Sequence, residues 1–169
     1  MAVQTGRTVS KFLNLVIADS TNTLRDIGVQ SLSVCGVTYE EQDLTVFQDA
    51  VMGALPNMPD APIEFTTIFD TTAAQAASGS GVAPALSGSH TVLAPLNGAM
   101  TPRTIDVQMG IRHTWETGEP QFGLTATDTS GYIMTQYNPN FDDQTVAVKF
   151  VLHPGSSLPA WGTAAEAAS

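Results

Sequence analysis

The sequence predicts a mainly β protein: an antiparallel β-sandwich or partly open barrel with one short flanking α-helix and a long inter-strand loop. Apolar and polar residues alternate in short runs, as they do on strands with one buried face. Turn-forming residues separate roughly seven or eight such runs, which is typical of antiparallel sandwiches and barrels. The 169 residues are most simply one domain, 1–169, with a substantial core.

The first strand is expected over residues 12–18, FLNLVIA. Arg7 and Lys11 precede this run and give it a superficial likeness to a signal peptide. Its apolar run is short and contains Asn14, so an ordinary strand after an N-terminal arm, 1–10, is favoured. The single cysteine, Cys35, excludes an intramolecular disulfide and is expected to be a small buried strand residue.

A polar turn, DSTNT, separates the first strand from VQSLSVCG, which places Leu32 and Val34 on one face. A long loop is then expected over 40–62, because Gly53 and three prolines limit any helix there to about one turn. Its tip would expose an apolar patch on a lone subunit, and such patches usually mark contact sites. The candidate contact residues are Val46, Phe47, Val51, Met52, Leu55 and Met58. The competing interpretation is that the loop folds back onto its own core.

Alternation resumes over 63–70, and Asp70 or Thr71 is placed to cap a short alanine-rich helix, TAAQAA. The longest alternation in the chain covers 104–115. The runs QFGLTATD and GYIMTQYN, joined around TSG, are expected to pair as a hairpin.

The closing strand, TVAVKFVL, alternates strictly until Pro154 and Gly155 end the pattern. Its expected core face carries Val146, Val148, Phe150 and Leu152. The opposite face carries Thr145, Ala147, Lys149 and Val151. The remaining tail, 157–169, has no period and is expected to be a C-terminal arm.

The composition points away from nucleic-acid binding and from membrane insertion. Sixteen acids oppose six bases, for a formal charge of -10, whereas phosphate contacts need Lys and Arg. Only 13% of the residues are charged, so much of the polar surface is Ser, Thr, Asn and Gln. Removing water from these uncharged groups against a partner costs little free energy. No run approaches the ~20 apolar residues of a membrane helix.

No pattern indicates an enzyme, a cofactor or a metal site. His90, His113 and His153 are far apart in sequence, whereas a structural zinc site usually draws four Cys or His ligands. The oxygen-rich stretch 138–143 lacks the glycine and glutamate of a helix-loop-helix calcium site, so a turn between strands explains it better. Glu41 and Asp43 would share a strand face, but a solvated acidic face is a better interpretation than a glycosidase pair.

The order of these features resembles the major tail tube proteins of long-tailed, siphovirus-like bacteriophages. The matching phrases are Leu55–Asp70, Tyr137–Pro139 and Thr145–Trp161, and the resemblance extends over about residues 10–163. One departure is NMPD, where that family often has a glycine before the strand.

The resemblance implies a structural virion protein. Subunits of that family form hexameric rings whose inner sheets join into one barrel, and the rings stack into a tail tube that DNA crosses during ejection. The resemblance also implies that the long loop and its candidate contact residues lie against the adjacent ring. The expected partners are therefore further copies of the chain and other tail proteins, with location in the virion tail after synthesis in the host cytoplasm. An acidic lumen would repel DNA. The candidate lumen-facing acids are Glu40, Glu41, Asp43 and Asp106, although each could instead face outside solvent.

Two other classes remain compatible with the sequence. A capsid decoration or tail-terminator protein would share the β-rich character but form a single ring or a trimer. A carbohydrate-binding β-sandwich would need exposed aromatic side chains, and Trp115 and Trp161 are the two tryptophans available.

Overall fold

The computed structural model describes residues 13–43, 54–75, 86–109 and 120–163. These residues confirm the mainly β fold: three antiparallel sheets and one short helical segment. The strands are β1 (Leu13–Ala18), β2 (Leu24–Ile27), β3 (Val29–Cys35), β4 (Thr38–Asp43), β5 (Ala54–Asp60), β6 (Ile63–Ile68), β7 (Ile105–Met109), β8 (Pro120–Leu124), β9 (Tyr132–Asn140), β10 (Thr145–Leu152) and β11 (Ala160–Thr163). The helical segment joins α1 (Ser89–Leu93) to the 3-10 turn η2 (Ala94–Leu96).

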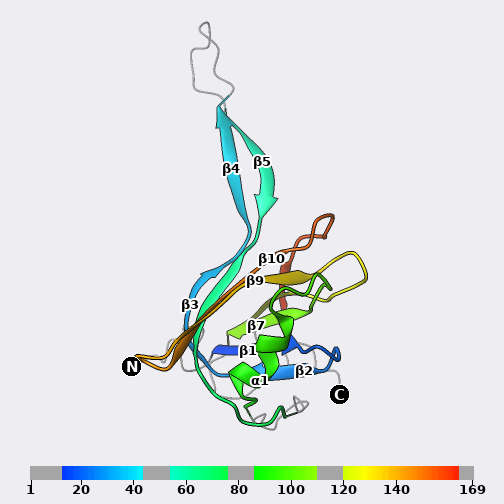
Figure 1. Ribbon diagram of the computed structural model, residues 1–169. Coiled ribbons are helices and arrows are strands. Elements are labelled where there is room, and N and C mark those ends of the chain that lie inside the picture. Colours follow the sequence, from blue (N-terminus) through cyan, green and yellow to red (C-terminus); the bar gives the residue numbers. More distant parts are fainter. Residues whose placement is uncertain (1–12, 44–53, 76–85, 110–119, 164–169) are drawn as a thin grey trace, which may run out of the picture.

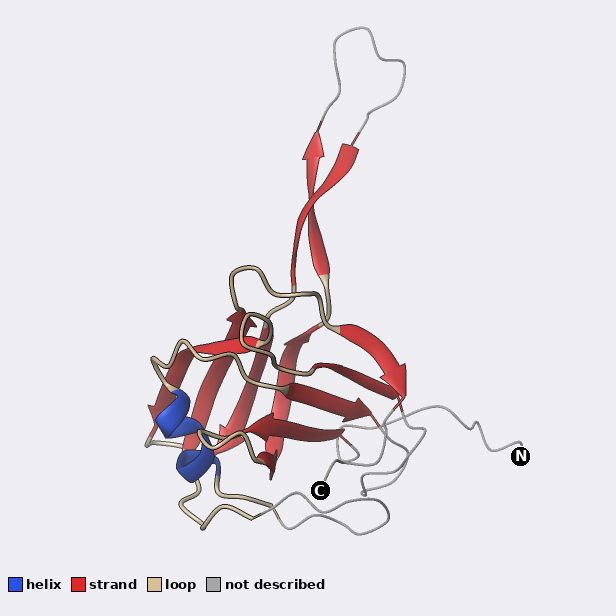
Figure 2. Ribbon diagram, turned by 90° about the vertical axis from the view of Figure 1, so that its right-hand side faces the viewer, coloured by secondary structure: helices blue, strands red, loops and turns tan. Residues whose placement is uncertain are grey.

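Two sheets form the body, and a two-stranded ribbon leaves it (Figures 1 and 2). The five-stranded sheet has the order β11-β8-β7-β1-β2, and the four-stranded sheet has the order β3-β6-β10-β9. The ribbon pairs β4 with β5. Within the described ranges neither body sheet closes on itself, so the architecture is a sandwich rather than a barrel. Isolated bridges at Ile27↔Ser87 and Arg103↔Tyr132 cover parts of the edge strands β2 and β9.

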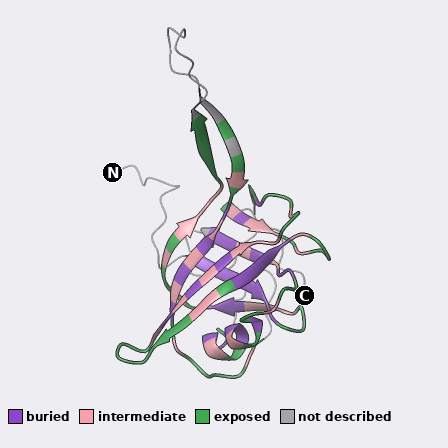
Figure 3. Cartoon of the chain, turned by 45° about the horizontal axis from the view of Figure 1, so that its top comes forward, coloured by how far each residue is buried: buried purple, intermediate pink, exposed green. Residues whose placement is uncertain are grey.

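The hydrophobic core lies between the two sheets. Alternate residues of both sheets point inward, as the period of two requires, and Phe65 stacks on Phe150 with ring centroids 6.3 Å apart. Val92, Leu93 and Leu96 add the helical segment to this cluster. Burial is concentrated in the body and is sparse on the ribbon (Figure 3).

The closing strand β10 lies in the middle of the four-stranded sheet, between β6 and β9. Val146, Val148 and Phe150 are buried, and Leu152 packs against the core at the strand end. Lys149 lies on the opposite face and forms an ion pair with Glu64, with Nζ 2.6 Å from Oε1.

The expected helix at TAAQAA is wrong over its described part, since residues 71–75 are not helical. Asp70 uses its Oδ1 to accept hydrogen bonds from the Thr72 amide and hydroxyl, at 2.8 and 2.7 Å. This local turn competes with helix formation. The helix forms later, at α1, where Gly88 precedes it; a Cβ on Gly88 would lie 2.3 Å from the Thr72 carbonyl oxygen. Residue 88 must therefore be glycine, because any side chain there would collide with the backbone of Thr72.

Two other expectations about connectivity are wrong. β8 pairs with β7 and β11, and β9 pairs with β10, so the β8 and β9 runs belong to different sheets and are no hairpin. The expected C-terminal arm, 157–169, contains β11, which pairs with β8 from Ala160 to Thr163. The N-terminal arm, 1–10, and the outer half of the 104–115 alternation lie outside the described residues.

The two expected turns are present. The turn expected over 138–143 lies at 141–144, between β9 and β10, because 138–140 still belong to β9. Gln144 in this turn has a positive φ of 57°. In the DSTNT turn, the Asp19 carboxylate accepts hydrogen bonds from Thr21, Thr23 and Arg25. Burial alone would raise the pKa of Asp19, but these hydrogen bonds outweigh it and lower the pKa to about 2.

Candidate assembly surfaces

The ribbon of β4 and β5 continues a strand pair of the body. β3 and β6 pair from Val29↔Thr67 to Cys35↔Ile63, and the same register continues into the ribbon at Thr38↔Asp60. Gly36, at a φ of +147°, lies where the chain leaves the sheet. One long hairpin therefore has its base in the core and its outer half in solvent, and at about 3.3 Å per residue β4 extends about 20 Å from the body (Figure 1).

In its described parts, 40–43 and 54–62, the expected long loop is largely strand. Prolines at 56 and 59 indicated a loop, but a two-stranded ribbon has a free edge on each strand, where proline removes no ladder hydrogen bond. The pairing carries a register shift between Tyr39 and Glu41 that accommodates an extra residue on β5. A bulge of this kind twists a ribbon more strongly.

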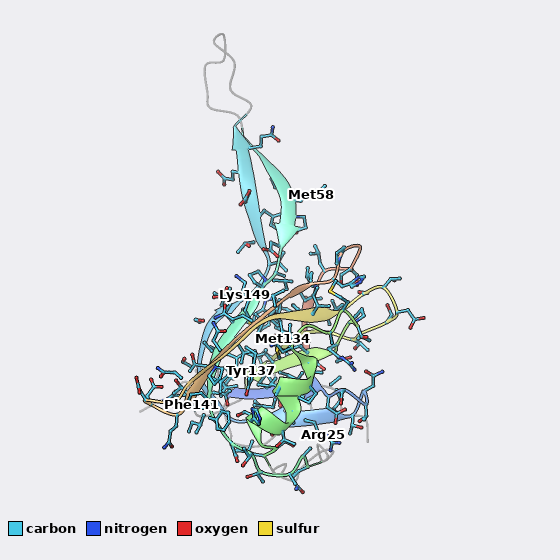
Figure 4. The ribbon with its side chains drawn as sticks, viewed as in Figure 1. Arg25, Met58, Met134, Tyr137, Phe141 and Lys149 are labelled. Carbon is cyan, nitrogen blue, oxygen red and sulfur yellow. The ribbon has the colours of Figure 1, made fainter. Side chains whose placement is uncertain are left out.

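The candidate contact residues divide between the described ribbon and the part outside it. Val46, Phe47, Val51 and Met52 lie outside the described residues. Leu55 lies on β5 opposite Gln42. Met58 is 85% exposed on the same strand (Figure 4), and Tyr39 on β4 is 52% exposed. The described part of the ribbon thus presents large apolar side chains to solvent far from the core.

The candidate lumen-facing acids do not form one surface. Glu40 and Glu41 are exposed on β4, and they are consecutive strand residues, so they point to opposite faces of the ribbon. Asp43 ends the same strand, opposite Ala54. Asp106 lies on β7 in the five-stranded sheet, half-buried, where burial raises the pKa of its carboxyl despite a hydrogen bond from Gln121.

A second acid on the five-stranded sheet was not predicted as a site residue. Asp26 on β2 is only 2% exposed, and its Oδ1 has no hydrogen-bond partner. Burial raises the pKa of Asp26 to about 7, against the opposing effect of the Ile27 amide. Sequence alone did not reveal this acid, because LRDI resembles the end of an ordinary exposed strand.

The outer face of the four-stranded sheet is nearly uncharged and mostly polar, with the exposed Ile68 as an apolar exception. Thr66, Thr145 and Asn138 lie on it, and the Lys149–Glu64 ion pair neutralises two of its charges. Hydroxyl and amide groups on this face can contact a partner without the cost of desolvating a charge.

Both edges of that sheet also lack charge. β3 reads VQSLSVC and β9 reads YIMTQYNPN, and neither contains a charged residue. Monomeric proteins usually protect edge strands with charges, prolines or coverage. Pro139 protects only the outer end of β9, whereas the edge strand β2 of the other sheet carries Arg25 and Asp26. The backbone of Tyr132, at the start of β9, already pairs with Arg103. Among the described residues, the β3 edge and the rest of the β9 edge are therefore suited to pairing with another chain.

The described residues contain no group of three His, Cys, Asp or Glu side chains placed to hold a metal ion. Cys35 is partly buried at the end of β3, and burial raises the pKa of its thiol to about 11. In the described part of the chain, no helix has the length and apolar character needed to cross a membrane.

No protein-family model and no curated protein matches this sequence. Solved structures do match the fold across nearly the whole chain. A chain from the sheath/tube terminator of the PVC extracellular contractile injection system, in its extended state, aligns with a TM-score of 0.53 at 13% identity, covering 95% of this chain and 99% of that one. The fold is shared with contractile injection system components.

Two further structures support the same fold. A chain from the tube-terminating cap of the anti-feeding prophage aligns with a TM-score of 0.52 at 11% identity, covering 97% of this chain and 100% of that one. A chain from the PVC sheath-tube complex in its extended state aligns with a TM-score of 0.54 at 10% identity, with 95% of both chains covered. Both alignments cover nearly the whole length of each chain.

Proposed function

We propose that this chain is a structural, non-enzymatic subunit of a tail or injection-tube assembly, and that it forms the terminating ring. The observation that carries the proposal is the whole-chain match to chains from a sheath/tube terminator and a tube-terminating cap. The sandwich with open sheet edges and a projecting ribbon also suits a protein whose surfaces are completed by neighbouring copies. This terminator function takes precedence over the tube-subunit function that the sequence suggested.

The ring would form through the four-stranded sheet. The β3 edge of one copy would pair with the β9 edge of the next, a head-to-tail contact that closes into a ring if the rotation is right. Each copy contributes four strands to this sheet, and closure would remove the open β3 and β9 edges of this sheet. Six copies per ring is the number that the resemblance to tail tube proteins implies.

In that arrangement the outer face of the four-stranded sheet would line the lumen. Its hydroxyl and amide groups, with Lys149 paired to Glu64, would not retain phosphates, so DNA could pass without specific binding. Asp106 would lie on the other sheet, away from the lumen, and Glu40 and Glu41 would lie on the ribbon. The acidity of the chain would then act at the ring ends and outer surface.

The second candidate is a repeating tube subunit, which the match to a chain of the PVC sheath-tube complex favours. It is also the function that the resemblance to long-tailed phages predicts, although the matched structures belong to contractile systems. Either function would place the protein in the tail of an assembled particle after synthesis in the host cytoplasm, with other tail proteins as partners.

Native mass spectrometry of the purified chain tests the ring. Six copies of a 17.8 kDa chain weigh about 107 kDa, and a discrete species at that mass supports a closed hexameric ring. A distribution of masses without a closed species favours the repeating tube subunit. A monomer at every concentration would contradict both functions.

A further inference from the structure

Strand β11 is an open edge of the five-stranded sheet. It pairs with β8 from Ala160 to Thr163, and among the described residues no strand lies on its other side. Ala160, Trp161 and Gly162 are all exposed, and the strand AWGT carries no charge. The opposite edge strand, β2, carries charged residues and is bridged to Ser87. β11 therefore lacks the protection that edge strands of monomeric proteins usually have.

A pocket of about 240 Å³ lies beside this edge, on the face of the sheet that points away from the core. Its lining includes Gly123, Ala160 and Gly162, which have little or no side chain, together with Asp106 and Gln121. Asp106 is the Cα partner of Gly123, and Gly123 is the Cα partner of Ala160. The row that runs from Asp106 to the edge therefore leaves room for a side chain from another molecule.

The Asp106 carboxyl group extends over β8 toward this edge. A Cβ on Gly123 would lie 2.0 Å from Asp106 Oδ1, so that oxygen occupies the space that a side chain at residue 123 would fill. Burial raises the pKa of the Asp106 carboxyl despite a hydrogen bond donated by Gln121. A cation from outside would favour the charged carboxylate and offset the cost of its burial. The pocket therefore suits a basic side chain.

Trp161 presents an apolar surface on the other face of the same edge. It is the Cα partner of the buried Phe122, with ring centroids 5.1 Å apart, and it is 56% exposed. A sugar would need the tryptophan ring and the polar groups on one surface, but the ring and the Asp106 carboxyl group lie on opposite faces. Consecutive side chains of an extended strand also point to opposite faces. The arrangement therefore fits a strand rather than a carbohydrate.

The place of this edge in the ring indicates a different protein rather than a second copy. Copies in the proposed ring meet through the four-stranded sheet, so the β11 edge lies outside that contact. Pairing of two β11 edges would need a two-fold axis, and neighbouring copies in a rotational ring are not related by one. The described bases of this chain, Arg25, Arg103 and Lys149, are already engaged.

We propose that β11 is a strand-addition site for an extended segment of a different protein, in which apolar and basic residues alternate. The segment would pair with the backbone of β11, place a basic side chain beside Asp106 and place an apolar side chain against Trp161. The inference rests on the proposed function, because the ring leaves this edge free and excludes a second copy from it.

A labelled peptide that alternates valine and lysine tests the site by fluorescence anisotropy with the full chain. We expect saturable binding that is at least about tenfold weaker for Asp106→Asn and for Trp161→Ala, because a charged hydrogen bond or an aromatic anchor contributes that much. Asp128→Asn is the matched control, because Asp128 is an exposed acid in a different pocket. No binding by the wild type, or equal weakening by Asp128→Asn, would overturn the site.

Two further measurements separate strand pairing from general attraction between charges. Hydrogen–deuterium exchange of residues 160–163 should slow when the peptide binds, because amides at an open edge become paired. A peptide with glutamate in place of lysine should not bind. Peptide binding without slower exchange at 160–163 would overturn strand addition. Dimers of the free chain that disappear with Trp161→Ala would place a second copy on the edge and would also overturn it.

Peptide binding and ring formation are measured separately. Rings that do not bind the peptide would overturn the strand-addition site and leave the proposed function standing. Peptide binding by a chain that stays monomeric at every concentration would support the site and contradict the ring.

Discussion

Asp26 and Asp106 lie in one cross-strand row, each the Cα partner of Val16 from a neighbouring strand. They share the face of the five-stranded sheet that points away from the core, and burial raises the pKa of both carboxyls. The folded protein therefore tolerates this row best when Asp26 is protonated.

Asp26→Asn should raise the free energy of unfolding at pH 8 but not at pH 4. The Asp26 carboxyl ionises near pH 3.8 in the unfolded chain and near 7 in the folded protein, so the unfolded state binds fewer protons between these values. The free energy of unfolding therefore falls by up to about 4 kcal/mol as pH rises from about 4 to about 7. Above about pH 7 this carboxyl causes no further change. Thermal melting at both pH values checks this.

Asp19→Asn is the matched control with the opposite sign. The pKa of Asp19 is lowered to about 2 in the folded protein, so its carboxylate stabilises the fold above pH 3.8, and that contribution is lost as pH falls through about 2. The substitution should lower the melting temperature at pH 7. A stabilising Asp19→Asn, or an Asp26→Asn that melts like wild type at pH 8, would refute these assignments.

Val148→Asp should prevent folding, whereas Lys149→Glu should not. Val148 is buried in the core, and an unpaired charge there costs about 3 kcal/mol or more. Lys149 is its neighbour on the outer face, in a partly exposed ion pair worth about 1 kcal/mol or less. Circular dichroism melts of both variants test which face of β10 is buried. If the two variants melt at the same temperature, the assigned faces of β10 are wrong.

Removing the ribbon should leave the body folded. No described residue of β4 or β5 belongs to the core cluster, and Thr38 and Asp60 are paired Cα partners that a two-residue turn can join. Replacing 39–59 by Asn-Gly should shift the melting temperature by no more than about 5 °C while abolishing stacking. An unfolded variant would mean that the ribbon folds with the core, and normal stacking would exclude a docking function.

The chain should bind duplex DNA weakly even at low salt. Its formal charge is -10, and all three described bases are engaged: Arg25 with Asp19, Lys149 with Glu64, and Arg103 with the Asp19 carbonyl and Asn22. Fluorescence anisotropy with a labelled duplex should give a Kd weaker than about 1 µM. Tighter binding by the assembled form would contradict a lumen that does not retain DNA.

The sandwich was predictable because strand alternation reports burial directly. The burial of Val146, Val148 and Phe150 follows the period of two in the sequence. Connectivity was less accessible: QFGLTATD and GYIMTQYN are adjacent in sequence, yet their strands lie in different sheets. No local pattern distinguishes a hairpin from a crossover between sheets when the connection is short.

The assembly surfaces were only partly predictable, because their residues depend on tertiary placement. Pro56 and Pro59 indicated a loop, and only the ribbon's free edges allow them in a strand. Met58 was recognised as an apolar contact residue, but the β11 edge was not, since residues 157–169 were expected to be an arm and this strand depends on pairing with β8. Nothing in the sequence indicated that Asp26 is buried, because the four residues LRDI of β2 do not show whether a carboxyl lies inside the protein or in solvent.

Negative-stain electron microscopy of the purified wild-type chain, imaged over rising concentration, tests the central claim most directly. A terminating ring subunit should appear as discrete rings with a central hole, limited to one ring or a short stack. Long tubes would identify the repeating tube subunit instead. A field of monomers at all concentrations would contradict the ring-forming account.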